Sequence, residues 1–422
     1  MSLPWPLLAR TPTRPGDHPP PVPAPDPPRQ HRRLPPAASH RAILHRLGLL
    51  PGPLALSPGR LAASSAPRRR DRPTADRRRR HLAGHRTWLV DGTGVSMPDP
   101  RALQGAFGQP TNQAEGCGFP VSRLLALFHT GTGMLQSFLV SPLRSHEMAH
   151  VARQHPELHP DDVLVGDRAF GTFAHLALLV SRGLHGLFHM AQRRVIDFTP
   201  NRPAPPRWNT RKVSGKARSL WIRSLGPTDQ VVQWYKPYLR PVWMSQEDHA
   251  ALPVTLTVRE CRYQVNQRGF RVRTITLVTT LLDADRYPAI TLAQLYQQRW
   301  QVETDLAHLK TTLKVDMLHC ETEEGVRKEM TTFAIVYNLV RLVRIEASRR
   351  QGVPVSRISF VDALRWLSSS PPGPPLPKLI VNPERPNRIE PRSKKRRAKK
   401  HPYMKQPRHV LRQRLLNQQV AV

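Results

Sequence analysis

Two short apolar runs, each ending in an aspartate, most strongly constrain how this chain can fold. The first is Thr87-Trp88-Leu89-Val90-Asp91, and the second is Val163-Leu164-Val165-Gly166-Asp167. Short apolar runs bounded in this way are typical of buried strands. The sequence therefore predicts two buried strands, each of which presents a carboxylate at its C-terminal end.

A set of four residues in the second half of the chain predicts a third carboxylate, on a helix. Tyr296, Arg299, Glu303 and Lys310 follow one another at intervals of three, four and seven. On one continuous helix, expected from about 292 to 313, they would fall within an arc of about 60°. A stripe that carries a phenol, a guanidinium, a carboxylate and an ammonium suits a surface that holds a metal ion and a phosphate together.

Three carboxylates placed by regular elements are a plausible ligand set for magnesium. Mg²⁺ takes oxygen ligands and keeps several of its waters. Two divalent ions bridged by carboxylates are a known solution for in-line attack at phosphate. Asp91, Asp167 and Glu303 are therefore the candidate metal ligands.

Composition favours a polyanionic partner. The net charge is +35, and each phosphate that a basic side chain neutralises releases counterions. Charge alone does not separate an enzyme from a binding protein.

The three cysteines (Cys117, Cys261 and Cys320) form no CxxC pair, which predicts neither a zinc ribbon nor a disulfide framework. No apolar run reaches about 18 residues, so no membrane span and no membrane partner are expected.

Residues 1–85 differ in composition from the rest of the chain. They contain 18 prolines and 16 arginines but no lysine, glutamate, phenylalanine or tyrosine. Such a stretch lacks the side chains to pack a core. We interpret it as a disordered extension or as the product of a wrong reading frame, and a basic arm that touches DNA is the alternative.

A globular pattern begins at residue 86. Strands are expected at 87–91, 121–129, 134–142, 162–167 and 185–191, and helices at 146–155 and 172–182, in the order β-β-β-α-β-α-β. Residues 193–286 are rich in Val, Thr and aromatic residues and predict a β-rich insertion with strands at 230–236, 252–265 and 269–283. A second long helix is expected at 324–350. Residues 351–422 form a basic C-terminal region.

These motifs resemble the insertion-sequence-4 family of DDE transposases. The resemblance rests on Asp91 in WLVDGTG, on Asp167 in LVGDRAFG, and on the Tyr-x2-Arg-x3-Glu-x6-Lys signature that contains Glu303. It implies an α/β fold in which an RNase H-like mixed sheet is flanked by helices. In this family a β-rich insertion precedes the helix that carries the catalytic Glu. Glu303 follows Asp167 by 136 positions, which leaves room for one, so 86–192 and 287–350 would form the catalytic core.

The resemblance also implies roles for individual residues. Asp91, Asp167 and Glu303 would hold two Mg²⁺ ions, with Mn²⁺ as a substitute, and would cleave DNA at transposon ends and join it to target DNA. Tyr296, Arg299 and Lys310 would contact phosphates beside the scissile bond. A flipped base would stack on an aromatic residue of the insertion, for which Trp234 is the candidate and Trp221 and Trp243 are the alternatives. The partners would be transposon-end and target DNA bound by a homodimer, in the bacterial cytoplasm at the nucleoid.

Two other functions remain open from the sequence. The chain could be a catalytically dead remnant of a transposase that still binds DNA. His146-Glu147-Met148-Ala149-His150 also fits HExxH, in which two histidines one helical turn apart bind zinc in metalloproteases. The motif fixes only three positions in a chain with 19 histidines, so we expect an ordinary solvated helix there.

Overall fold

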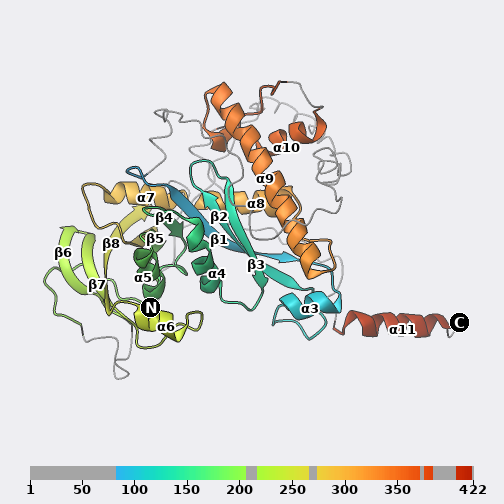
Figure 1. The fold of residues 1–422 in the computed structure, drawn as a ribbon, viewed down its shortest axis with the longest axis horizontal. Coiled ribbons are helices and arrows are strands. Elements are labelled where there is room, and N and C mark those ends of the chain that lie inside the picture. The colour runs from blue at the N-terminus through green and yellow to red at the C-terminus, as the bar shows by residue number, and fades with distance from the viewer. Residues whose placement is uncertain (1–81, 206–215, 266–272, 371–374, 384–404, 421–422) are drawn as a thin grey trace, which may run out of the picture. The chain divides into compact units, whose positions relative to one another are not determined.

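The computed structural model describes residues 82–205, 216–265, 273–370, 375–383 and 405–420 (Figure 1). The interpretation of residues 1–81 therefore lies outside the described residues, as does the lysine- and arginine-rich run at 393–400.

A nine-stranded mixed sheet organises the described chain. The strands are β1 (Thr87–Ser96), β2 (Val121–His129), β3 (Leu135–Pro142), β4 (Val163–Gly166), β5 (His185–His189), β6 (Leu220–Gly226), β7 (Asp229–Tyr235), β8 (Thr255–Val265) and β9 (Arg273–Thr279). Their order in the sheet is β3-β2-β1-β4-β5-β9-β8-β7-β6. Strands β4 and β5 run parallel in the centre with β1, and every other pairing is antiparallel. The predicted mixed α/β fold of RNase H type is confirmed. The seven predicted elements follow one another as expected, except that a helix at Arg101–Phe107, which was not predicted, lies between β1 and β2.

The β-rich segment continues this sheet. Its last strand, β9, pairs with β5 through Leu187↔Thr279 and Phe188↔Val278, so the sheet runs on into β8, β7 and β6. The sequence predicted three of these four strands and missed β6. A buried ion pair then ties the segment to the chain that follows, because Arg259 bonds both carboxylate oxygens of Asp229 and the carbonyl of Tyr287.

Helices cover both faces of the sheet at β1. Helices α4 (Glu147–Gln154) and α5 (Phe173–Ser181) share a core with Trp88 and Val90. Helix α9 (Glu323–Gln351) packs on the other side, where Tyr337 contacts Phe128 of β2 (Figure 1). Because side chains alternate along a strand, Asp91 points away from the α4 face, toward α8 (Trp300–Ala307).

The helix expected at 292–313 is interrupted. The structure has α7 (Ala289–Gln297), a turn at 298–299, α8, and a π-helical turn at His308–Thr312. Across the break, the amides of Gln301 and Val302 bond to the carbonyls three residues earlier, so the helix tightens there. The prediction of one regular helix was wrong because composition does not reveal such local changes in hydrogen bonding.

The remaining helices complete the described chain. They are α3 (Arg101–Phe107), α6 (Gln246–Ala251), α10 (Phe360–Ser369) and α11 (Arg408–Val420). The second long helix, expected at 324–350, is confirmed as α9. It begins at Thr322, whose side chain accepts a hydrogen bond from the amide of Gly325, and it ends at the left-handed Gly352. Within the described ranges, no helix combines the length and the apolar character needed to cross a membrane.

Candidate active site

Strand register brings the two predicted aspartates together. Leu89 of β1 lies beside Val165 of β4 in a parallel pair. Asp91 follows two residues later inside β1, which continues to Ser96, so the expectation that the strand ends at Asp91 was wrong, whereas Asp167 directly follows β4 as expected. Continuing the register puts the two aspartates at neighbouring positions, about 5 Å apart between strands. β4 ends at Gly166, and a Cβ there would lie 2.7 Å from the ring of Phe170. Glycine thus permits the close packing just before Asp167.

Local hydrogen bonds orient both carboxylates. Oδ1 of Asp91 accepts a bond from the amide of Gly92 at 2.8 Å, and Oδ1 of Asp167 accepts one from the amide of Ala169 at 2.7 Å. Burial raises the pKa of Asp91, and repulsion from Asp167 adds to the effect, while the Gly92 amide and Arg299 oppose it. A raised pKa means that the negative charge on Asp91 lacks compensation, which a bound cation would supply.

Arg299 connects these strands to the acidic helix. Its Nη1 lies 3.9 Å from Oδ2 of Asp91, and its Nη2 donates to Oε1 of Glu303 at 3.2 Å. The arginine side chain is 13% exposed, whereas that of Glu303 is 49% exposed. Three of the predicted site residues, Asp91, Arg299 and Glu303, therefore form one connected group, with Asp167 beside Asp91.

The other two members of the helical stripe differ in exposure. Tyr296 is buried against the ring of His189 on β5, and burial raises the pKa of its hydroxyl. Lys310 lies in the π-helical turn and is half-buried. Tyr296 thus supports the base of the site from inside, while Lys310 lies seven residues beyond Glu303, about two helical turns away.

Glu147 is a fourth carboxylate that the sequence placed on a solvated helix. It begins α4, and its Oε1 comes so close to strand β1 that a Cβ at Gly92 would lie 2.1 Å away. Its Oε2 accepts a 3.3 Å ion pair from Arg123 of β2. Burial raises its pKa, and the charge of Asp167 contributes. The signal in the sequence was the glycine after Asp91, which leaves room for a neighbouring side chain.

The structure does not favour the zinc-protease alternative. The ring Nδ1 of His146 accepts the amide of Met148 as the N-cap of α4, and His150 is buried in the packing of that helix. Among the described residues, the histidines and the acid of the HExxH segment do not converge on a shared point with a third ligand. The motif here is part of an ordinary capped helix.

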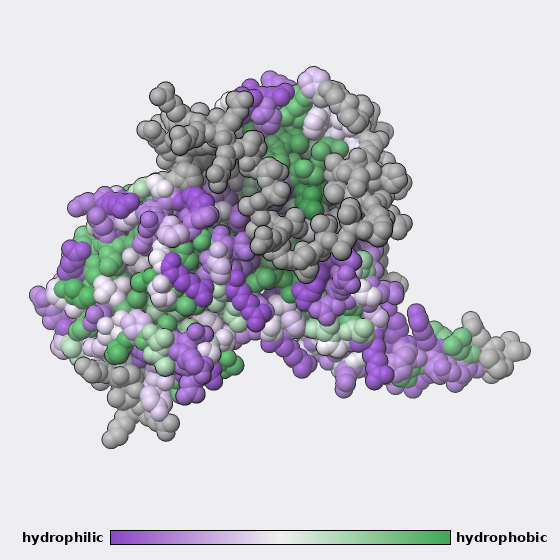
Figure 2. Space-filling view, viewed as in Figure 1, coloured by the Kyte–Doolittle hydropathy of each residue, from purple (hydrophilic) through white to green (hydrophobic). Residues whose placement is uncertain are grey.

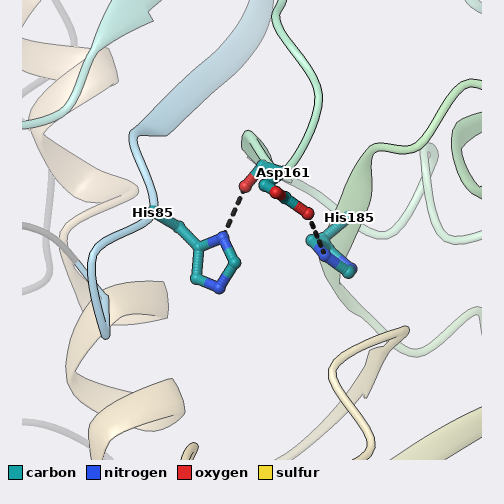
Figure 3. A group of neighbouring side chains, drawn as sticks. All are labelled: His85, Asp161 and His185. Atoms are coloured by element: carbon teal, nitrogen blue, oxygen red, sulfur yellow. Dashed lines mark hydrogen bonds and ion pairs between the residues drawn. The ribbon is translucent and has the colours of Figure 1, made fainter.

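A different group of possible ligands lies at the opposite end of the central strands (Figure 3). Ligand atoms of His85, Asp161 and His185 lie within 4.8 Å of one another. His85 precedes β1, Asp161 precedes β4, and His185 begins β5, so the group sits at the N-terminal edge, about 13 Å along β1 from Asp91. The ring of His85 bonds the Asp161 carbonyl and the Tyr287 hydroxyl, each at 2.6 Å. This cluster is separate from the aspartate pair.

The prediction that Trp234 stacks on a flipped base is wrong for this structure. The residue is 0% exposed, and its indole N–H donates to Oε1 of Glu260 at 2.9 Å. The guanidinium of Arg194 covers the ring, 3.5 Å from its centroid. A base needs an open ring face, so Trp234 is a core residue. Trp221 and Trp243 are partly buried.

The donor set fits a hard divalent cation. Asp91, Asp167 and Glu303 all offer carboxylate oxygens, the ligands that Mg²⁺ prefers, and Glu147 adds a further carboxylate on the α4 side of β1. The raised pKa of Asp91, caused first by burial and also by the charge of Asp167, agrees with that fit. Asp91 and Asp167 would hold the ion that lies nearest the sheet.

Comparisons with known proteins identify the family of this chain. Residues 82–339 match the family described as the transposase DDE domain. The transposase InsG of insertion sequence element IS4 from Escherichia coli (strain K12) is 28% identical over 343 residues, which cover 76% of this chain and 70% of that protein. A probable transposase of insertion sequence element IS5377 from Geobacillus stearothermophilus is 37% identical over 89 residues, covering 21% of this chain and 23% of that protein.

A solved structure of the piggyBac transposase synaptic complex with hairpin DNA is more distantly similar. It shows 11% identity and a TM-score of 0.36, and the match covers 67% of this chain and 51% of that one. The family match spans the aspartate pair, Arg299, Glu303 and Glu147. The chain therefore belongs to the family of transposases with a DDE domain.

Proposed function

We propose that this transposase cleaves DNA at transposon ends and joins it to target DNA with Asp91, Asp167 and Glu303 as the ligands of two Mg²⁺ ions. The observation that carries the proposal is the nearness of Asp91, inside β1, to Asp167, directly after the neighbouring parallel strand β4, with Arg299 extending from Asp91 to Glu303. When bound, Mg²⁺ would lower the pKa of a water or a 3′-hydroxyl and would stabilise the leaving oxygen.

The protein's own residues then hold and orient the reacting groups. The Gly92 and Ala169 amides fix the rotation of the two aspartates, so that their remaining oxygens face the substrate side. Arg299 offers a guanidinium fork that matches a phosphate. Lys310 adds positive charge about two helical turns beyond Glu303. Tyr296 packs beneath Arg299 and limits its movement, because the two side chains are in contact.

The DNA partners and the assembly belong to the same proposal. The net charge of +35 favours binding to transposon-end and target DNA and association with the nucleoid. Two ends must be held together for excision, so we propose a homodimer on paired ends. Analytical ultracentrifugation with end DNA would show two protomers per synaptic complex, and one protomer on each separate end would contradict the dimer.

Metal-dependent cleavage of the element's own ends is the direct test. Labelled end DNA would be incubated with Mg²⁺, Mn²⁺, Zn²⁺ or EDTA, using the wild type, Asp91→Ala and Asp161→Asn. Asp161 is a matched control, since it is an exposed aspartate at the opposite edge of the same strands. We expect nicking with Mg²⁺ or Mn²⁺ in the wild type and in Asp161→Asn, and none in Asp91→Ala.

Two results would contradict the proposal. DNA binding without nicking under every metal would support a catalytically dead remnant. Loss of nicking in Asp161→Asn, with Asp91→Ala still active, would transfer the metal centre to the cluster in Figure 3.

A further inference from the structure

A pocket of about 550 Å³ lies on the side of α8 that faces away from the active site. Gln301, Thr304 and Asp305 line it from α8, and His308 lines it from the π-helical turn that follows. On a helix, Gln301 and Asp305 each lie about 160° from Glu303. Residues 354–356 and Phe360 at the start of α10 close another part of the wall, and Figure 2 shows apolar surface over α9 nearby. The mechanism proposed above does not use this pocket.

Two nearly buried guanidinium groups from α9 line the pocket. Arg341 is 7% exposed and Arg344 is 3% exposed. Arg341 forms an ion pair with Asp305, at 3.1 Å between Nη1 and Oδ1, and its Nε donates to the carbonyl of Thr132. Asp305 is the acidic residue of the lining, so two permanent positive charges share one carboxylate.

Arg344 retains a donor that is not used. Its Nε and Nη2 donate to the carbonyls of Ile358 and Val355, each at 2.9 Å. Its Nη1 has no hydrogen-bond partner among the described residues. Burial, with the charge of Arg341, lowers the pKa of Arg344 to about 10. A buried donor on a charged group is costly to leave unpaired, which favours an anion at this place.

His308 extends the polar wall. Its ring stacks on that of Phe360 with centroids 4.1 Å apart, which fixes its plane. Its Nδ1 lies 3.9 Å from Oδ1 of Asp305 and has no hydrogen-bond partner in the described part of the chain. The pocket therefore combines a free guanidinium N–H and an imidazole nitrogen with an excess of one positive charge.

We propose that this pocket binds a phosphate group through Arg344 and His308. A phosphate oxygen can accept from Nη1 of Arg344 in the fork geometry that guanidinium groups favour. The volume is large enough for a phosphate together with part of a sugar. The group could come from the backbone of bound DNA or from inorganic phosphate. Only the first source rests on the function proposed above.

Inorganic phosphate is the first probe, and it requires no DNA. Binding to the full chain would be measured by calorimetry and by ³¹P line broadening, against chloride at equal ionic strength. Gln301→Glu adds a carboxylate to the pocket at an exposed position and leaves the buried arginines untouched, and Ser356→Glu does so from the segment after α9. Gln246→Glu makes the same change on exposed α6 and is the matched control.

We expect saturable phosphate binding in the wild type and in Gln246→Glu. Binding should be at least about tenfold weaker in Gln301→Glu and Ser356→Glu, and this result would support the pocket. Equal binding in all four proteins would overturn it, because the phosphate would then sit on general basic surface. Thermal unfolding without phosphate confirms that each variant is folded.

The second arm of the experiment identifies the source of the phosphate. The affinity for end DNA would be measured by anisotropy at several salt concentrations. If a DNA phosphate occupies the pocket, the slope of log K against log salt falls by about one in Gln301→Glu relative to Gln246→Glu. Equal slopes would assign the pocket to inorganic phosphate. The phosphate arm stands even if the chain proves unable to cleave DNA.

Discussion

The guanidinium of Arg299 lies 3.9 Å from the carboxylate of Asp91, across the space between α8 and β1. The same guanidinium donates to Glu303, so one cation links two of the three proposed metal ligands. Because Arg299 is mostly buried and packs on Tyr296, its position depends on the tightened turn between α7 and α8. The break in the helix thus serves the geometry of the site.

Arg299→Lys should separate charge from geometry at this position. Lysine keeps the positive charge but loses the planar fork that reaches both acids. We expect single-turnover cleavage to fall on the order of 100-fold, as for other small misplacements of catalytic groups, while the affinity for end DNA stays near that of the wild type. Arg327→Lys, in an exposed pair with Glu323 on α9, is the control. A wild-type cleavage rate in Arg299→Lys would show that the fork is not needed.

Glu303→Gln should abolish cleavage and leave DNA binding nearly intact. Glutamine has the same shape, but it lacks the charge needed to hold a cation, so a loss on the order of a thousandfold is expected. Cleavage assays and anisotropy with the same end DNA measure the two effects. The matched control is Glu324→Gln, which removes an exposed ion pair with Lys328 on α9. If cleavage and binding fell together, Glu303 would have a structural role.

Gly92→Ala should damage the site through Glu147. The added Cβ would lie 2.1 Å from Oε1 of Glu147, so either the strand or the glutamate must move. Because Oε1 is the far end of a flexible side chain, Glu147 can move aside, so we expect denaturant unfolding to show a loss of less than about 1 kcal/mol. We also expect reduced cleavage, because the amide of Gly92 orients Asp91.

A double-mutant cycle with Glu147→Ala tests this assignment. If the two side chains clash, removing Glu147 should recover most of the stability lost in Gly92→Ala. Additive losses of stability would show that the alanine at position 92 destabilises the strand without a clash with Glu147.

The sequence predicted the central fold because strand and helix signals there are strong and local. Apolar runs predicted β1 and β4, and the turn at Thr130-Gly131-Thr132-Gly133 predicted a hairpin whose arms are β2 and β3. The sequence could not show that β9 pairs with β5, because pairing between distant segments leaves no local pattern. It missed β6 as well, whose residues are largely exposed and lack a buried face.

The positions of site residues could be predicted where an apolar run or helical spacing indicates them. The structure brings together four residues expected on that ground, Asp91, Asp167, Arg299 and Glu303. Glu147 was not expected there, because its place depends on how α4 packs against β1. The prediction for Trp234 was wrong because a tryptophan among valines in a strand predicts burial as readily as exposure. Its partner Glu260 lies 26 residues away, so no local pattern indicates their hydrogen bond.

A buried pair of histidines should make the protein unstable in acid. Nε2 of His155 lies 3.0 Å from Nε2 of His175, and the rings stack. His175 uses its Nδ1 to donate to the carbonyl of Phe170, so its Nε2 is the acceptor and His155 is the donor. Burial lowers the pKa of His175 to about 4 and that of His155 to about 2. Both rings are therefore neutral in the folded protein.

Acid should lower the stability of the folded protein because burial lowers the pKa of both histidines. Both folded pKa values lie below the unfolded value near 6.5, so the unfolded chain takes up protons first as the pH falls. Stability should be constant above about pH 6.5 and should decrease below it, by about 1.4 kcal/mol per pH unit for each histidine. For His175 alone the loss reaches about 3 kcal/mol by pH 4.

His155→Gln isolates the contribution of one ring. The glutamine amide can still donate to Nε2 of His175 but does not titrate. Between pH 6 and 4.5, the slope of unfolding free energy against pH should therefore correspond to about one proton fewer than in the wild type. Urea unfolding at several pH values measures that slope. His319→Gln removes a histidine whose side chain is 81% exposed and should leave the slope unchanged. An unchanged slope in His155→Gln would mean that His155 is not held neutral in the folded protein.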